Sequence, residues 1–155
     1  MANVLNVAKY LINQSRPGTP ENITNLKLQK LLYYAQGFHL AILGRPLFEE
    51  EIQAWLHGPV VPEVYNEYKS FTYNDINKHY NLNMDDLSIE ERELLDDVWN
   101  IFKSYNGKVL EEMTHNEQPW IDARKGLDLR DYSNEIIAKR EIQRYFEREY
   151  IIEGN

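Results

Sequence analysis

Apolar residues recur every three to four positions in several parts of the chain, which places them on one face of a helix. This spacing predicts helices at 3–14, 26–43, 62–71, 89–105, 108–114 and 139–150, with a further short helical turn beginning at Pro119. The apolar stripe of the 26–43 segment is the broadest, so we expect that helix to be central.

Residues that favour helix ends flank these segments. Asn25 is the predicted N-cap of the second helix, and Gly44 follows its last turn, where a left-handed residue is favoured. Ser88 and Glu91 have the spacing of a capping box. The pair at 106–107, Asn-Gly, is expected to terminate the fourth helix.

The period shifts toward two at 51–56, which is typical of a strand. We therefore predict a mainly α fold, a compact bundle of about five to seven helices with a small β-hairpin or short antiparallel sheet at about 46–56. Residues 135–137 could add a short strand beside it. The stretch 72–87, rich in Asn, Asp and Tyr, is expected to be a loop.

The chain has 155 residues and no cysteine. That length suits one domain, predicted at 4–150 with short termini at 1–3 and 151–155. The absence of cysteine excludes a disulfide framework and a thiolate nucleophile. The N-terminus lacks the pattern of a signal peptide, and no segment has about 20 consecutive apolar residues, so we expect a cytoplasmic protein without membrane contact.

The formal net charge of −8 bears on the partner. Nucleic-acid binders usually present a basic patch, because neutralised phosphates supply much of their affinity. The densest basic stretch, 139–148, is interleaved with glutamates and is typical of a solvated helix face. Direct nucleic-acid binding is therefore disfavoured.

The residues that carry metal or catalytic chemistry show no known motif. The four histidines, at 39, 57, 79 and 115, have no i,i+3 or i,i+4 partner histidine, and the seven glycines form no phosphate-binding loop. We predict no metal, no cofactor and no enzymatic activity, although a site gathered from distant segments stays open. His39 is expected to be a core histidine with one hydrogen bond.

Aromatic residues make up 12% of the chain. Tyr and Trp are enriched in binding surfaces, yet they also fill helical cores, and for any single residue the core interpretation is favoured. Tyr33 and Tyr34 are consecutive helix positions, so at least one of them is expected at the margin of the stripe or against a partner.

Two stretches resemble a known family. One runs from Leu28-Gln-Lys-Leu-Leu-Tyr-Tyr-Ala-Gln-Gly-Phe-His-Leu through Gly44-Arg-Pro-Leu-Phe to Ala54-Trp-Leu-His-Gly-Pro-Val-Val-Pro-Glu-Val-Tyr65. The other is Thr114-His-Asn-Glu-Gln-Pro-Trp-Ile-Asp-Ala-Arg124. Together they resemble the Panacea, or SocA-like antitoxin, domain, which includes prophage proteins named GepA. The resemblance extends over about 4–150.

This resemblance implies an antitoxin that neutralises a cognate toxin by direct protein binding, with the toxin encoded by an adjacent gene. Many members carry an additional N-terminal region that this chain lacks, which argues against DNA-binding autoregulation. The alternatives are a proteolytic adaptor that delivers the partner to a protease, an enzyme that reverses toxin damage, and a transcriptional regulator. The oligomeric state cannot be derived from the sequence.

Two non-helical segments, 45–62 and 114–124, combine Trp, Pro and His, as functional loops often do. They suggest a partner-binding surface made of Glu49, Glu50, Trp55, His57, Pro59, Tyr65, His115 and Trp120. The structural alternative is that the Trp and Pro residues, with Gly58, hold the hairpin against the helices.

Overall fold

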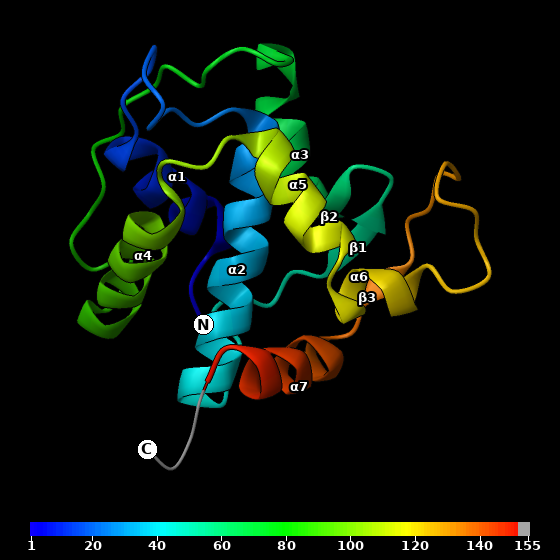
Figure 1. Cartoon of the computed structure of the whole chain (residues 1–155). Coiled ribbons are helices and arrows are strands. Elements are labelled where there is room, and N and C mark those ends of the chain that lie inside the picture. Colours follow the sequence, from blue (N-terminus) through cyan, green and yellow to red (C-terminus); the bar gives the residue numbers. More distant parts are fainter. Residues whose placement is uncertain (152–155) are drawn as a thin grey trace.

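A long helix, α2 (Asn25–Leu43), runs through the middle of the molecule, and the other elements pack around it (Figure 1). The computed structural model describes residues 1–151. The remaining helices are α1 (Val4–Gln14), α3 (Pro62–Tyr68) with the 3₁₀ turn η1 (Lys69–Phe71), α4 (Ile89–Phe102), α5 (Gly107–His115), α6 (Gln118–Ala123) and α7 (Lys139–Glu149). The predicted mainly α fold class is confirmed. The predicted C-terminal segment 151–155 lies outside the described residues except for Ile151.

Helix α2 is buried on nearly every side, because α1 and α4 cover one flank, α5 another, and α7 crosses its C-terminal half (Figure 1). The expected central position is confirmed. The expectation that Tyr33 or Tyr34 lies at a margin is wrong, since both side chains are fully buried. A helix surrounded by neighbours has no exposed margin in its middle, so consecutive residues can both be core.

Capping explains where several helices begin. The capping box of α4 is present, with Ser88 and Glu91 each accepting from the other's backbone. The N-cap of α2 is Thr24, whose side chain accepts from Lys27, so the prediction of Asn25 is one residue late. Asn106 does not terminate α4, which ends at Phe102; its side chain instead caps α5.

The sheet has three short antiparallel strands in the order β2 (Gly58–Val60), β1 (Ile52–Trp55), β3 (Ile136–Ile137). The predicted strand within 51–56 and its pairing with 135–137 are confirmed. The predicted hairpin at 46–56 is displaced, because β1 pairs with the residues that follow it. Phe48 instead bridges Ala2 in parallel, and Gln36 of α2 holds its backbone.

Among residues 1–151, no helix is long and apolar enough to cross a membrane.

Candidate functional site

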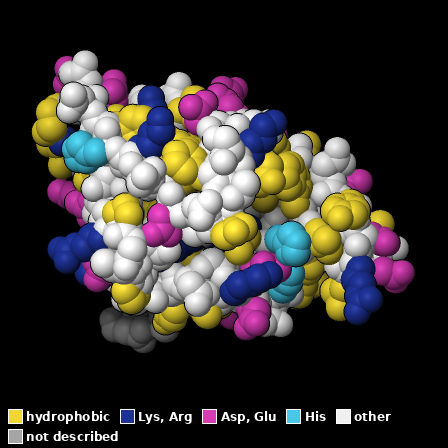
Figure 2. Space-filling view, turned by 90° about the horizontal axis from the view of Figure 1, so that it is seen from above, with side chains coloured by type: hydrophobic (Ala, Val, Ile, Leu, Met, Phe, Trp, Pro, Cys, Tyr) yellow, Lys and Arg dark blue, Asp and Glu magenta, His cyan; other side chains and the backbone are white. Residues whose placement is uncertain are grey.

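A pocket of about 940 Å³ opens where the β1–β2 hairpin meets the N-terminal half of α2 and the start of α5. Its lining comprises Asn25, Leu26, Gln29, Lys30, Trp55, Leu56, His57, Val60, Tyr65, Lys69, Thr72, Tyr73, Lys108, Glu111, Tyr132, Ser133 and Asn134. Such a volume lies in the range of ligand-binding pockets. Toward the lower right of Figure 2, histidine side chains gather beside basic, acidic and hydrophobic ones.

The hairpin turn places His57 at the pocket edge. Trp55 pairs with Gly58 across the turn, and Gly58 has a φ of 105°, which favours glycine. A Cβ at Gly58 would lie 2.5 Å from Cε of Lys30. The hairpin can therefore rest directly on the Lys30 side chain only because this residue is glycine.

Lys30 is completely buried beneath the hairpin and donates from Nζ to the carbonyl of Pro59 at 3.1 Å. Burial lowers the pKa of Lys30 to about 7, and the negative charge of Glu111 opposes this shift. The pocket thus contains a lysine whose charge near neutral pH depends on its surroundings.

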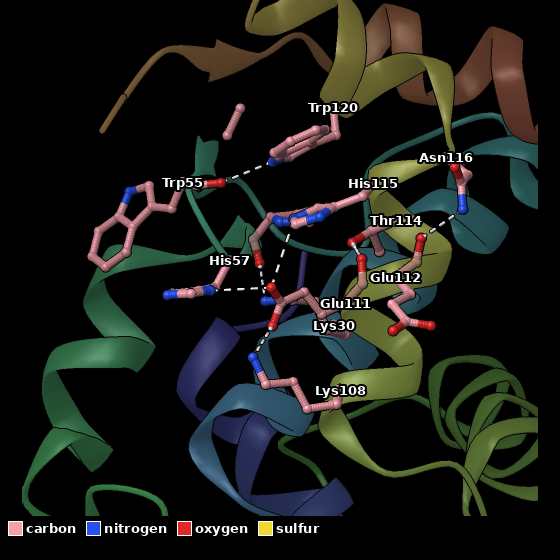
Figure 3. Close-up of polar contacts among 12 residues, drawn as sticks. Lys30, Trp55, His57, Lys108, Glu111, Glu112, Thr114, His115, Asn116 and Trp120 are labelled. Carbon is pink, nitrogen blue, oxygen red and sulfur yellow. Dashed lines mark hydrogen bonds and ion pairs between the residues drawn. The ribbon is translucent and has the colours of Figure 1, made fainter. Parts of the chain in front are cut away.

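Glu111 of α5 is at the centre of the polar contacts of the site (Figure 3). Its Oε2 lies 3.0 Å from Nδ1 of His57, and its Oε1 accepts from Lys108 at 3.3 Å. Nε2 of His115 lies 4.0 Å from Oε2. Burial raises the pKa of Glu111, but the hydrogen bond and charge of His57, with those of Lys108, outweigh it and lower the pKa. The carboxylate is therefore ionised and acts as a shared acceptor.

Trp120 connects α6 to the hairpin. Its indole N–H donates to the carbonyl of Trp55 at 2.8 Å, and its ring stacks on His115 at 4.1 Å between centroids (Figure 3). The guanidinium of Arg124 also lies over the Trp120 ring, 4.8 Å from its centroid. Trp120 is buried, so it holds the hairpin in place and presents no surface to a partner.

The structure brings together some of the sequence-predicted residues and separates others. Trp55, His57 and Tyr65 line the pocket. His115 is near Glu111 but is not part of the pocket lining, and Pro59 and Trp120 are buried. The remaining two, Glu49 and Glu50, precede β1 and so lie at its opposite end from the pocket.

Sequence reasoning missed Lys30, Lys69, Lys108 and Glu111. Lys30 carried no signal, because the helical period places it on the face opposite the apolar stripe of α2, where a lysine is expected to reach solvent, and only the hairpin packed over that face buries it. Nothing in the sequence could place Lys108 and Glu111 opposite His57, since the two segments are about fifty residues apart and meet only in the fold.

The remaining histidine prediction that the structure tests is His39, which is buried and has one hydrogen bond, 2.7 Å from Nδ1 to the carbonyl of Arg45. The predicted core role is confirmed. Within the described part of the chain, no group of three His, Cys, Asp or Glu residues is placed to hold a metal ion.

The fold and the pocket define a mainly helical domain whose hairpin and central helix border an open pocket lined by aromatic, apolar and polar residues. The family model described as "Antitoxin SocA-like, Panacea domain" matches residues 28–121, from α2 into α6. The chain belongs to this family. The predicted resemblance is confirmed at the family level.

One curated relative is Antitoxin SocA of Caulobacter vibrioides (strain NA1000 / CB15N), 56% identical over 43 residues. That match covers 28% of this chain and 23% of the relative's length. Comparison with solved structures gives no significant match.

Proposed function

We propose that this chain is an antitoxin that neutralises a partner toxin by binding it directly, with the pocket beside the β1–β2 hairpin at the centre of the contact surface. The observation that carries the proposal is the aromatic wall formed by Trp55 and Tyr65 inside the segment that matches the antitoxin family. Their rings meet edge to face with 4.9 Å between centroids.

Trp55 and Tyr65 are suited to a contact role because both are only half-buried and already fixed in position. Trp55 Nε1 donates to Gln53 at 2.8 Å, so its ring is oriented before any partner arrives. Rigid aromatic side chains lose little conformational entropy on binding and are common among the residues that dominate interface energies.

Stoichiometric masking is the mechanism that we favour. A stable complex buries about 1,600 Å² in total, so this chain would contribute about 800 Å². The pocket rim includes the exposed aromatic residues Tyr73 and Tyr132, which could form part of such a contact surface. We take the toxin to be encoded by an adjacent gene.

The test is co-expression with each neighbouring gene product, combining affinity co-purification with a growth assay. Masking predicts a stable complex of fixed stoichiometry and restored growth. A complex with a shortened toxin half-life would indicate a proteolytic adaptor. Rescue at substoichiometric amounts would indicate an enzyme, and a shifted promoter fragment without a complex would indicate a regulator.

Variants then locate the contact surface. Trp55→Ala and Tyr65→Ala should each weaken toxin binding by about tenfold or more, as for central aromatic contacts. Tyr105→Ala is the matched control, because Tyr105 is an exposed aromatic residue outside the pocket lining. Charge reversal at Glu49 and Glu50 tests whether the surface extends to the other end of β1. If the Trp55 and Tyr65 variants fold and neutralise the toxin fully, this pocket is not the contact surface.

A further inference from the structure

The pocket differs in charge from the molecule around it. The chain has 25 acidic and 17 basic residues, with a net charge of −8. Among the described residues that line the pocket there are three lysines, Lys30, Lys69 and Lys108, and a single carboxylate, that of Glu111. The pocket is thus a locally basic concavity in an acidic protein.

Glu111 shows how an anion is held there. It is buried, whereas its two hydrogen-bonding partners extend outward: the His57 side chain is 63% exposed and that of Lys108 is 72% exposed (Figure 3). Lys108 therefore retains donor capacity on its solvent side, and the second ring nitrogen of His57 can donate there as well when the ring carries both protons. An incoming carboxylate could accept from them without uncovering any buried group.

Lys30, buried beneath the hairpin, also favours binding of an anion in the pocket. Its ammonium has one hydrogen-bond acceptor, the Pro59 carbonyl, among the described residues. A second anion near the hairpin would favour its protonated form, so binding and proton uptake would support each other.

We propose that the pocket binds an acidic segment of the partner protein, with a carboxylate placed between His57 and Lys108 and an adjacent apolar side chain against Trp55 and Tyr65. The inference rests on the proposed function, because the partner that supplies this segment is the toxin.

A polyanion fits this surface less well. Nucleic-acid binding needs several phosphate contacts, and each contributes through release of a counterion. The pocket offers two exposed lysines, Lys69 and Lys108, on a chain whose overall charge repels a polyanion. A single acidic segment uses these cations without bringing a long run of negative charge against the acidic surface.

The first experiment selects a phage-displayed random dodecapeptide library on the purified full-length protein. The proposal expects enrichment of peptides with Asp or Glu next to an apolar or aromatic residue. The selected peptides are then synthesised, and their dissociation constants are measured by fluorescence polarisation. Enrichment of basic or neutral peptides, or no enrichment, would overturn the proposal.

Three variants test whether the affinity for the selected peptides changes in the direction that the charges of the pocket predict. Lys108→Glu should weaken binding by about tenfold, because it replaces attraction with repulsion. Glu111→Gln should tighten binding about threefold, because it removes the carboxylate that competes for His57 and Lys108. Lys125→Glu, at an exposed lysine outside the pocket lining, is the control for net charge.

A misfolded variant would lose affinity for the peptides. The tighter binding expected for Glu111→Gln therefore cannot be explained by misfolding. Unchanged affinity in both pocket variants would overturn the proposal. A labelled single-stranded RNA forms a second arm, and RNA that binds in a Lys108-dependent manner while acidic peptides do not would also overturn it.

The peptide selection requires no toxin, so the two failures can be told apart. A wild-type toxin complex with no acidic-peptide binding removes only this inference. Acidic-peptide binding without any toxin complex removes the antitoxin role and leaves the pocket chemistry in place.

Discussion

The hydroxyl of Tyr33 donates a 2.8 Å hydrogen bond to Oε1 of Glu117, 84 residues further along the chain. Tyr34 and Tyr150 donate to the other carboxylate oxygen. Glu117 is the N-cap residue of α6 and is only 4% exposed. Its carboxylate therefore joins α2, the start of α6 and the end of α7 inside the core.

Glu117 should give the protein a recognisable pH dependence. Burial raises the pKa of Glu117 above its ordinary value, and the three hydroxyl bonds oppose this only partly. The native state then holds a proton that the unfolded state has released, so this contribution to stability is complete below the unfolded pKa, near 4.5, and is lost as pH rises through the folded pKa.

Urea titrations across this acid range, on the wild type and on Glu117→Gln, isolate the effect. The wild-type unfolding free energy should fall with rising pH relative to that of the variant. Parallel curves for the two proteins would mean that Glu117 titrates as in the unfolded chain. Glu117→Ala should cost about 3 kcal/mol, at about 1 kcal/mol for each of three buried hydrogen bonds.

Gly37 should resist a substitution that helix propensity favours. In an exposed helix, Gly→Ala stabilises by about 1 kcal/mol. A Cβ at Gly37 would lie 2.4 Å from the ring of Phe146, so α7 would have to move away from α2. Gly37→Ala should therefore lower the unfolding free energy by about 1–3 kcal/mol, as overpacking does.

The measurement is a chemical denaturation midpoint for Gly37→Ala, with Gly37→Ala/Phe146→Leu as the relieving double variant. A smaller loss in the double variant than the two single losses combined would assign the cost to this contact. A stabilised Gly37→Ala would contradict the close packing of α2 against α7.

The sequence predicted the helices better than their surroundings. The 3.6-residue period of α2 and the box at Ser88 are local signals, and the structure confirms both. Errors arose where the competing signal was not local. Tyr33 and Tyr34 are buried together because α7 covers them, and β1 pairs forward because Gly58 fits over Lys30.

The candidate site follows the same rule. Trp55, His57 and Tyr65 were predicted from one segment, and the structure places all three at one pocket. Lys108 and Glu111 come from another segment, with no motif to connect them to the first. Their charges determine the chemistry of the pocket, so the chemistry could not be predicted although part of the location could.

Arg124 should be essential to the wall of the pocket. It is buried, and its guanidinium donates to the carbonyls of Ala54 at 3.1 Å, Asp128 at 3.3 Å and Asp131. These contacts attach the segment after α6, which includes the pocket-lining Tyr132, to strand β1. Arg124→Lys loses the planar fork and should cost about 2–3 kcal/mol.

Limited trypsin digestion reports the local effect. In Arg124→Lys, cleavage after Lys125 and Arg130 should accelerate relative to the wild type, because their segment has lost its anchor. Arg144→Lys is the matched control, since Arg144 is exposed on α7. Equal digestion rates in both variants would show that the segment is held by other contacts.

Gly58 sets the distance between the hairpin and Lys30. Alanine at this position faces two costs: a backbone φ of 105° and a Cβ only 2.5 Å from Lys30 Cε and 2.9 Å from Thr114 Oγ1. Gly126→Ala is the matched control, because Gly126 also has a positive φ, 89°, but open space around its Cβ. The control should cost about 1 kcal/mol, and Gly58→Ala about 2 kcal/mol more.

A double variant separates the two costs at Gly58. Lys30→Leu removes Cε, so Gly58→Ala should cost less in that background than in the wild type, while the cost of Gly126→Ala should be the same in both. Thermal or urea unfolding of the six proteins gives the coupling free energy. A coupling near zero would mean that the hairpin does not rest on Lys30, and that the cost at Gly58 comes from its backbone conformation and from Thr114.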